Sequence, residues 1–191
     1  HDLTFAADAD RITGDGLDLD DVTGTLDIAN LQIFVASDGT TEPEGLSVDI
    51  DTDISATAFT LNVASGTIDA DEGRAIEIER AIFNGTLTDV TGAGLNFEEM
   101  TTTGLTFAGT TDINSSQNTS TTSRNVTIED ALTGNVTFDT LQIATSGDNE
   151  TALDLSDLVL NGTNRANAYA ATALSHTGAV AVSLNCTTGG P

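Results

Sequence analysis

The chain has 191 residues and a formal net charge of −25, because 30 acidic residues outnumber five Arg and Lys is absent. Hydrophobic residues make up 38% and aromatic residues only 4%, so we expect a thin core of Leu, Ile, Val and Ala. A field this negative repels nucleic acid and anionic lipid, and no apolar run approaches the ~20 residues that span a bilayer. We therefore expect a single domain, residues 1–191, that binds no nucleic acid and inserts into no membrane.

Residues 1–15 precede the first repeat of the chain. They contain the partly apolar run Leu3-Thr4-Phe5-Ala6. The end of a stack of strands exposes unpaired backbone groups and apolar core, which another segment has to cover. We expect residues 1–15 to form this N-terminal cap.

Residues 16–165 consist of degenerate repeats. Each copy contains an apolar–polar–apolar triplet, and this period of two indicates a strand with one buried face and one solvated face. The copies start roughly 20–30 residues apart, a spacing typical of solenoids. They are Leu17-Asp18-Leu19, Leu46-Ser47-Val48, Ile76-Glu77-Ile78, Leu95-Asn96-Phe97, Val126-Thr127-Ile128 and Leu153-Asp154-Leu155, followed by Val180-Ala181-Val182 as a degenerate last copy.

Two longer matches support the same repeat. Leu17–Ile33 aligns with Val126–Ile143, and Ala75–Thr86 aligns with Ala152–Thr163. No segment shows a sustained period of 3.6, so helices between the strands are not expected. We predict an all-β fold, a right-handed parallel β-helix (a β-solenoid) of about seven coils. An antiparallel β-sandwich, with strands about 8–12 residues apart, is the alternative.

Residues 166–191 depart from the repeat. The segment is rich in Ala and alternates at Val180, Val182 and Leu184. It is expected either to cap the column or to add a strand to a neighbouring subunit. Exchange of this kind would join subunits head to tail, and such a contact propagates into a filament because it does not close.

The phrase GLDLDDVTGTLDIANLQI, residues 16–33, resembles the strand repeats of large bacterial surface proteins, namely adhesins and autotransporter-type passengers. The resemblance covers about residues 12–165. It implies a right-handed β-helix at the cell surface or outside the cell. It identifies no individual functional residue.

Eight Asn-x-Ser/Thr sequons are consistent with export and are candidate glycosylation sites. β-Turns also favour Asn followed by small polar residues, so the sequons have a structural explanation as well. They are at Asn84, Asn114, Asn118, Asn125, Asn135, Asn149, Asn161 and Asn185.

Calcium is the one cofactor that we consider, because Ca²⁺ prefers carboxylate and carbonyl oxygens. Two loop clusters provide spaced carboxylates, although neither has the spacing of an EF-hand. The first contains Asp8, Asp10 and Asp15, and the second contains Asp69, Asp71 and Glu72. The remaining acidic pattern, Asp18 with Asp20 and Asp49 with Asp51 and Asp53, predicts outward strand faces in contact with water.

The sequence predicts no catalytic residues. Enzymes that cleave acidic polysaccharides need carboxylates with nearby Lys or Arg, and here Lys is absent and the five Arg are scattered. We therefore expect a secreted, non-enzymatic protein at the cell surface, either a structural subunit of a filament, pilus-like fibre or surface layer, or an adhesin. Its partners would be further copies of itself, or a surface receptor or glycan. A carbohydrate-active β-helix enzyme or a carbohydrate-binding module is the alternative.

Overall fold

A computed structural model of the chain describes residues 2–5, 12–36, 44–70, 73–114, 124–129, 134, 136–145, 151–154, 175–176 and 180–183. The described residues form strands, turns and irregular segments, and they contain no helix. The predicted all-β class is therefore confirmed for this part of the chain.

The strands belong to two sheets. The nine-stranded sheet contains β1 (Asp2–Phe5), β2 (Ile12–Thr13), β4 (Gly24–Ile28), β5 (Asn30–Ala36), β7 (Phe59–Asp69), β9 (Ile82–Gly92), β11 (Leu105–Asn114), β13 (Val136–Thr145) and β15 (Ser175–His176). The seven-stranded sheet contains β3 (Leu17–Asp20), β6 (Leu46–Asp49), β8 (Arg74–Glu79), β10 (Gly94–Glu98), β12 (Arg124–Glu129), β14 (Thr151–Asp154) and β16 (Val180–Ser183).

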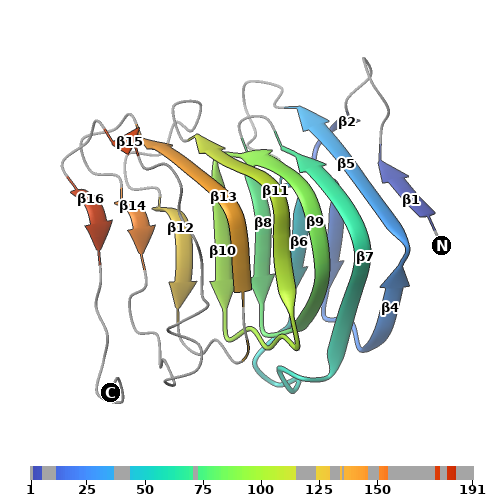
Figure 1. Ribbon diagram of the computed structural model, residues 1–191. Helices are drawn as coiled ribbons and strands as arrows, with labels where there is room; N and C mark the ends of the chain where they lie inside the picture. The colour runs from blue at the N-terminus through green and yellow to red at the C-terminus, as the bar shows by residue number, and fades with distance from the viewer. Residues whose placement is uncertain are drawn as a thin grey trace.

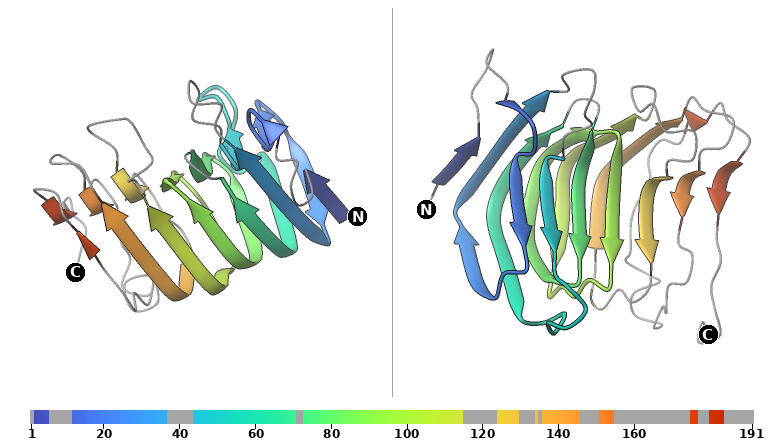
Figure 2. Two further views of the ribbon diagram at one scale, coloured as in Figure 1. Left: turned by 90° about the horizontal axis from the view of Figure 1, so that it is seen from above. Right: turned by 180° about the vertical axis from the view of Figure 1, so that it is seen from behind.

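From β5 onward the chain alternates between the two sheets, and each strand pairs with the strand two places later in the chain. Figure 1 shows β5, β7, β9, β11 and β13 side by side, and the right-hand view of Figure 2 shows the seven-stranded sheet from behind. We call one strand of the seven-stranded sheet, together with the strand or strands that follow it in the other sheet, a rung. The first rung is β3 with β4 and β5, and the next three are β6 with β7, β8 with β9, and β10 with β11.

Every ladder between the described strands is parallel. An antiparallel sandwich would instead pair strands that are adjacent in the sequence. The alternative fold is therefore wrong for the described residues, and the predicted parallel arrangement is confirmed.

The predicted triplets are the strands of the seven-stranded sheet. One position is apolar in every strand and aligns in the order Leu17, Leu46, Ile76, Leu95, Val126, Leu153 and Val182. This position is buried in β6, β8, β10 and β12. In the last strand it is the third residue of the expected triplet, Val182, that aligns, and Val180 pairs with Thr151. A shift of two residues leaves the buried face unchanged because side chains alternate with a period of two.

The long strands of the nine-stranded sheet are irregular near their middle. β4 and β5 together pair with β7, so that Ile28 pairs with Val63 and Leu31 with Gly66. The register between β7 and β9, and between β9 and β11, shifts in the same region. Irregularities of this kind bend a strand, and Figure 1 shows these strands curving.

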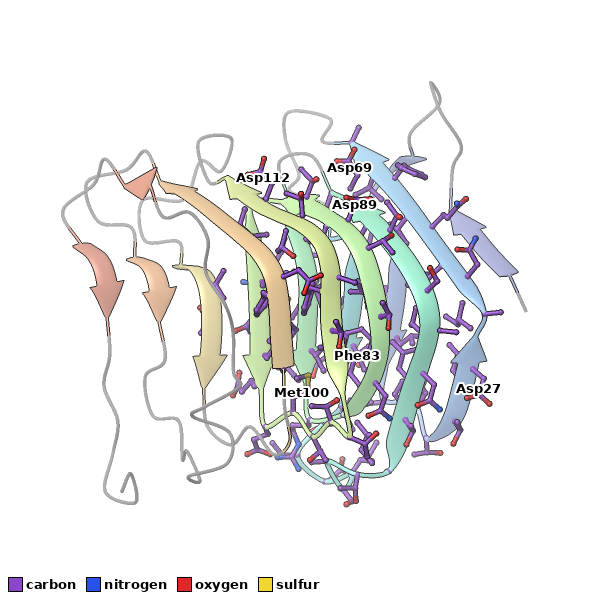
Figure 3. All side chains as sticks on the ribbon, viewed as in Figure 1. Asp27, Asp69, Phe83, Asp89, Met100 and Asp112 are labelled. Carbon is purple, nitrogen blue, oxygen red and sulfur yellow. The ribbon has the colours of Figure 1, made fainter. Side chains whose placement is uncertain are left out.

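The core lies between the two sheets and is apolar along the described rungs. Phe97 of β10 lies 6.3 Å from Phe107 of β11, measured between ring centroids. Phe107 stacks on Phe138 of the next strand at 4.3 Å. All three rings are at most 1% exposed. Figure 3 labels two further buried residues, Phe83 and Met100.

The turns at the ends of the seven-stranded sheet have specific backbone requirements. Before β6, a Cβ on Gly45 would lie 2.6 Å from the carbonyl oxygen of Ala75 in the next rung, so only glycine fits there. After β3, β8 and β10, the residues Asp21, Arg80 and Glu99 have φ of 51°, 60° and 45°. L-residues adopt this left-handed conformation at a cost of roughly 1 kcal/mol.

Short strands extend the sheets at both ends of the array. β1 and β2 pair with β5, and they belong to the segment 1–15 for which we predicted a cap. β15 pairs with β13 and β16 with β14, so the segment 166–191 adds one strand to each sheet. Gly14 and Asp15 are also described, and the remaining residues of these two segments lie outside the described part of the chain.

Candidate functional site

The outward face of the seven-stranded sheet contains an unbroken row of acidic residues. The position three residues after the aligned apolar residue is acidic in β3, β6, β8, β10 and β12, and the backbone register aligns Asp20, Asp49, Glu79, Glu98 and Glu129 there. Neighbouring strands of a sheet lie about 4.8 Å apart, and like charges directly opposite each other destabilise a sheet. We call these five positions the carboxylate row.

In the nine-stranded sheet, the acidic residues near the C-terminal ends of the strands do not align with one another. Asp69 of β7 aligns with Thr91, which in turn aligns with Asp112 of β11. Asp89 of β9 aligns with Thr67 on one side. Figure 3 shows Asp69, Asp89 and Asp112 near the C-terminal ends of their strands. Threonine thus separates these carboxylates, and the uninterrupted row is specific to the other sheet.

A second outward position of the seven-stranded sheet aligns Asp18, Ser47, Glu77 and Asn96. This position and the carboxylate row border a hollow of about 330 Å³, which we call the Glu44 hollow. Its lining residues are Asp15, Asp18, Asp20, Glu44, Ser47, Asp49, Glu77 and Glu79.

Arg74 is the cation beside the Glu44 hollow. Its Nη1 atom lies 3.6 Å from Oε1 of Glu44 and contacts Oε1 of Glu77. The same oxygen of Glu77 accepts a hydrogen bond of 3.2 Å from Nδ2 of Asn96. The backbone N–H of Glu44 donates to Oδ1 of Asp15 at 2.9 Å. Contacts at this point therefore link the segments just before β3 and β6 to the strands β8 and β10.

The environment moves the pKa values of Glu44 and Glu77 in opposite directions. The pKa of Glu44 is raised to about 8, first by burial and then by the hydrogen bond and charge of Glu77, while Arg74 and Ser47 act in the other direction. Burial alone would also raise the pKa of Glu77, but the hydrogen bond with Glu44 and the contacts with Arg74 and Asn96 outweigh it and lower the value.

Two members of the carboxylate row also have raised pKa values. For Asp49 the causes are burial and then the neighbouring charges of Asp20 and Asp21. For Glu79 they are burial and then the charges of Glu77 and Asp49. The direction is that expected when like charges lie side by side.

A second hollow of about 270 Å³ lies at the left-handed turns and contains Arg80. The Nη1 atom of Arg80 contacts Oε2 of Glu99, and its Nη2 atom donates to the carbonyl oxygen of Ile54 at 3.1 Å. Arg80 is the only basic residue among the side chains that line this hollow. Its charge is thus already paired with Glu99.

Two of the six predicted calcium ligands lie among the described residues. Asp15 lines the Glu44 hollow, and Asp69 is the last residue of β7 in the other sheet. Asp8, Asp10, Asp71 and Glu72 lie outside the described residues. Within the described ranges, no group of three or more His, Cys, Asp or Glu side chains is arranged to hold a metal ion. Calcium binding stays a prediction.

One expected strand face is wrong. Asp49, Asp51 and Asp53 were predicted to alternate along a single strand, but β6 ends at Asp49. The chain then turns, with the N–H of Ile54 donating to the carbonyl oxygen of Asp51 at 3.0 Å. The alternation of acidic and other residues continues through a turn, where alternate side chains no longer lie on the same face of a sheet.

Among the sequons, Asn84 is the one whose side chain is described. Its Nδ2 donates to Oδ1 of Asn62 at 2.9 Å, and Asn62 donates to Asp27 at 2.7 Å. Its Oδ1 accepts from the backbone N–H of Thr103 at 2.7 Å. Asn84 thus belongs to a hydrogen-bond ladder across four rungs, and glycosylation would have to use the nitrogen that donates to Asn62.

The other sequons give less structural information. Asn114 is the last residue of β11 and Asn125 lies in β12. The remaining five, Asn118, Asn135, Asn149, Asn161 and Asn185, lie outside the described residues. Glycosylation stays a prediction at all eight positions.

The sequence does not match any protein-family model, and no curated protein or solved structure is similar to it. In the part of the chain that the structure describes, no helix is long and apolar enough to span a bilayer.

Proposed function

We propose that the chain is a right-handed parallel β-helix of about seven coils that serves as an extracellular, non-catalytic structural subunit and assembles head to tail at a cell surface. The observation that carries this proposal is the register of the seven-stranded sheet. One apolar position stays in register from Leu17 to Val182 without interruption. An array in which each rung contacts only its neighbours forms a rod, and a strand of the same pattern can extend it at either end.

The exterior supports the same role. The carboxylate row and the net charge of −25 keep rods apart laterally, since like-charged faces repel at low and moderate salt. Contact through the ends of the sheets is less affected because backbone hydrogen bonds and apolar side chains provide it. The resemblance of residues 16–33 to repeats of bacterial adhesins and autotransporter passengers supports a location at the cell surface.

Negative-stain electron microscopy of the purified chain in 0.15 M NaCl tests this proposal. We expect unbranched filaments one molecule wide, whose length increases with protein concentration. Isolated short rods at every concentration would contradict the filament and favour an adhesin that binds a receptor or glycan. Round particles would contradict the β-helix itself.

One observation favours a second function, a carbohydrate-active enzyme. Glu44 and Glu77 have pKa values displaced in opposite directions within one hollow, a pattern that is typical of acid–base pairs. Against this, both carboxyl groups meet at one nitrogen of Arg74. A glycosidase needs its two carboxyl groups about 5–10 Å apart, with the sugar between them.

The two functions are separated by an assay for reducing ends released from a panel of neutral polysaccharides. Activity that is lost in the Glu77→Gln variant would support the enzyme. We expect no release by the wild-type protein.

A further inference from the structure

Glu44 and Glu77 come from different rungs and compete for the same cation. Glu44 lies two residues before β6, and Glu77 lies within β8. Their Oε1 atoms approach the same Nη1 atom of Arg74, at 3.6 Å for Glu44 and in direct contact for Glu77. One guanidinium balances one negative charge, so two ionised carboxylates at this point would leave one charge unbalanced.

The two carboxyl groups have little freedom to move apart. Glu77 is held by Asn96 of β10, and the backbone of Glu44 is held by Asp15. Their side chains are 26% and 16% exposed, so solvent screens their repulsion only in part.

The other charged groups around the pair do not relieve the repulsion. The first rung contributes Asp15, Asp18 and Asp20, β6 contributes Asp49, and β8 contributes Glu79 beside Glu77 itself. All of them are acidic, and Arg74 is the one basic side chain that contacts the pair among the described residues. The cluster lowers its charge most readily by retaining a proton.

We propose that Glu44 and Glu77 share one proton at neutral pH, and that the hydrogen bond made by this proton holds the second rung to the third in a pH-dependent way. The protonated carboxyl group of Glu44 donates to the carboxylate of Glu77, which also accepts from Arg74 and Asn96. When the pH rises and the proton leaves to solvent, the hydrogen bond becomes a repulsion between two carboxylates. The raised pKa of Glu44, about 8, and the lowered pKa of Glu77 agree with this arrangement.

The direction of the pH effect follows from the folded-state pKa of Glu44. A carboxyl group whose pKa is raised by folding binds its proton more tightly in the folded state. Its contribution to stability is complete below pH 4.5, falls as the pH rises, and is lost above about pH 8. For one proton, the folding equilibrium constant falls by at most about tenfold per pH unit within this window. This inference concerns the cohesion of the rungs and does not depend on the proposed extracellular role.

The test compares urea unfolding of the full chain, followed by circular dichroism, at pH 6, 7, 8 and 9. The Glu44→Gln variant is informative because its amide donates to Glu77 but does not titrate. Asp53→Asn, in the exposed turn after β6, is the matched control for the loss of one negative charge. Between pH 6 and pH 9 we expect the folding equilibrium constant of the wild type and of Asp53→Asn to fall at least threefold more than that of Glu44→Gln. A smaller difference would overturn the proposal.

Carbon-13 NMR of the glutamate carboxyl groups in the wild-type protein provides a second readout, which does not require the variant to be stable. We expect the signal assigned to Glu44, by labelling and through-bond connectivity, to titrate near pH 8. The chemical shift of Glu77 should stay at the value of an ionised carboxylate. Titration of Glu44 at the ordinary value of a glutamate would show that no proton is shared.

Discussion

Truncation of Phe107 tests the assignment of inward and outward faces most directly. Phe107 is 1% exposed, stacks on Phe138 at 4.3 Å and lies 6.3 Å from Phe97 of the opposite sheet. Replacement by alanine removes a buried ring and leaves a cavity, a change that typically costs about 3–5 kcal/mol of unfolding free energy. About 0.5–1.5 kcal/mol of this is expected from the ring–ring contact with Phe138. Since domains of this size are stable by about 5–15 kcal/mol, Phe107→Ala should lose a large share of the unfolding free energy.

The assay is equilibrium urea unfolding followed by circular dichroism, with Thr110→Ala as the matched control. Thr110 lies on the same strand as Phe107 but is exposed, so its truncation should change stability by less than about 0.5 kcal/mol. In a double-mutant cycle with Phe138→Ala, the two truncations should couple by about 0.5–1.5 kcal/mol. A loss below about 1 kcal/mol for Phe107→Ala, or equal damage from Thr110→Ala, would refute the burial of this face.

Three further substitutions test the turns and the acidic face. Gly45→Ala should lose about 1–3 kcal/mol of unfolding free energy, because the new Cβ would lie 2.6 Å from the carbonyl oxygen of Ala75. Its control is Gly104→Ala, which should be neutral in thermal unfolding because no atom lies within 4 Å of the added Cβ. Equal melting temperatures of the two variants would contradict the close approach of the rungs. Asp21→Asn should stabilise by about 0.5 kcal/mol, since asparagine tolerates the positive φ of 51° and removes one charge, and a lower midpoint in urea would argue against strain there. Asp49→Asn should raise the urea midpoint at pH 7, and more so at 0.02 M than at 0.5 M NaCl. Burial and then the charges of Asp20 and Asp21 raise the pKa of Asp49. The stability that a group with a raised pKa contributes to the fold is lost as the pH rises past its folded-state pKa. No gain at either salt concentration would show that the carboxylate row is not repulsive.

Much of the fold was predictable because burial in a strand leaves a local signature. The triplet Leu17-Asp18-Leu19 and its copies have a period of two, and each copy became a strand of one sheet. The exception, Val180-Ala181-Val182, is shifted in register by two residues. Its alternation is correct, but periodicity alone cannot distinguish register positions that differ by a full period. The row of Asp49, Asp51 and Asp53 was wrong for a related reason, since the alternation continued past the end of the strand.

The candidate site was predictable only in its composition. Asp18 and Asp49 were predicted to face water and Asp15 to belong to a calcium-binding loop, but Glu44 carried no signal, because it lies in an irregular segment beside Pro43. Its partner Glu77 is 33 positions away in the sequence and belongs to the next rung. Spacing along the chain does not report such a pair when the segments between strands vary in length.

The sequence by itself determined the strand character of the chain, the identity of the inward residues and the sign of the surface charge, because these depend on alternation and composition. Only the tertiary structure decided which outward residues lie opposite one another. Parallel pairing aligned Asp20, Asp49, Glu79 and Glu98 directly, while in the other sheet it placed Thr91 between Asp69 and Asp112. Electrostatic energies depend on distances in space, and those distances follow from register, which is set by the packing of the whole array.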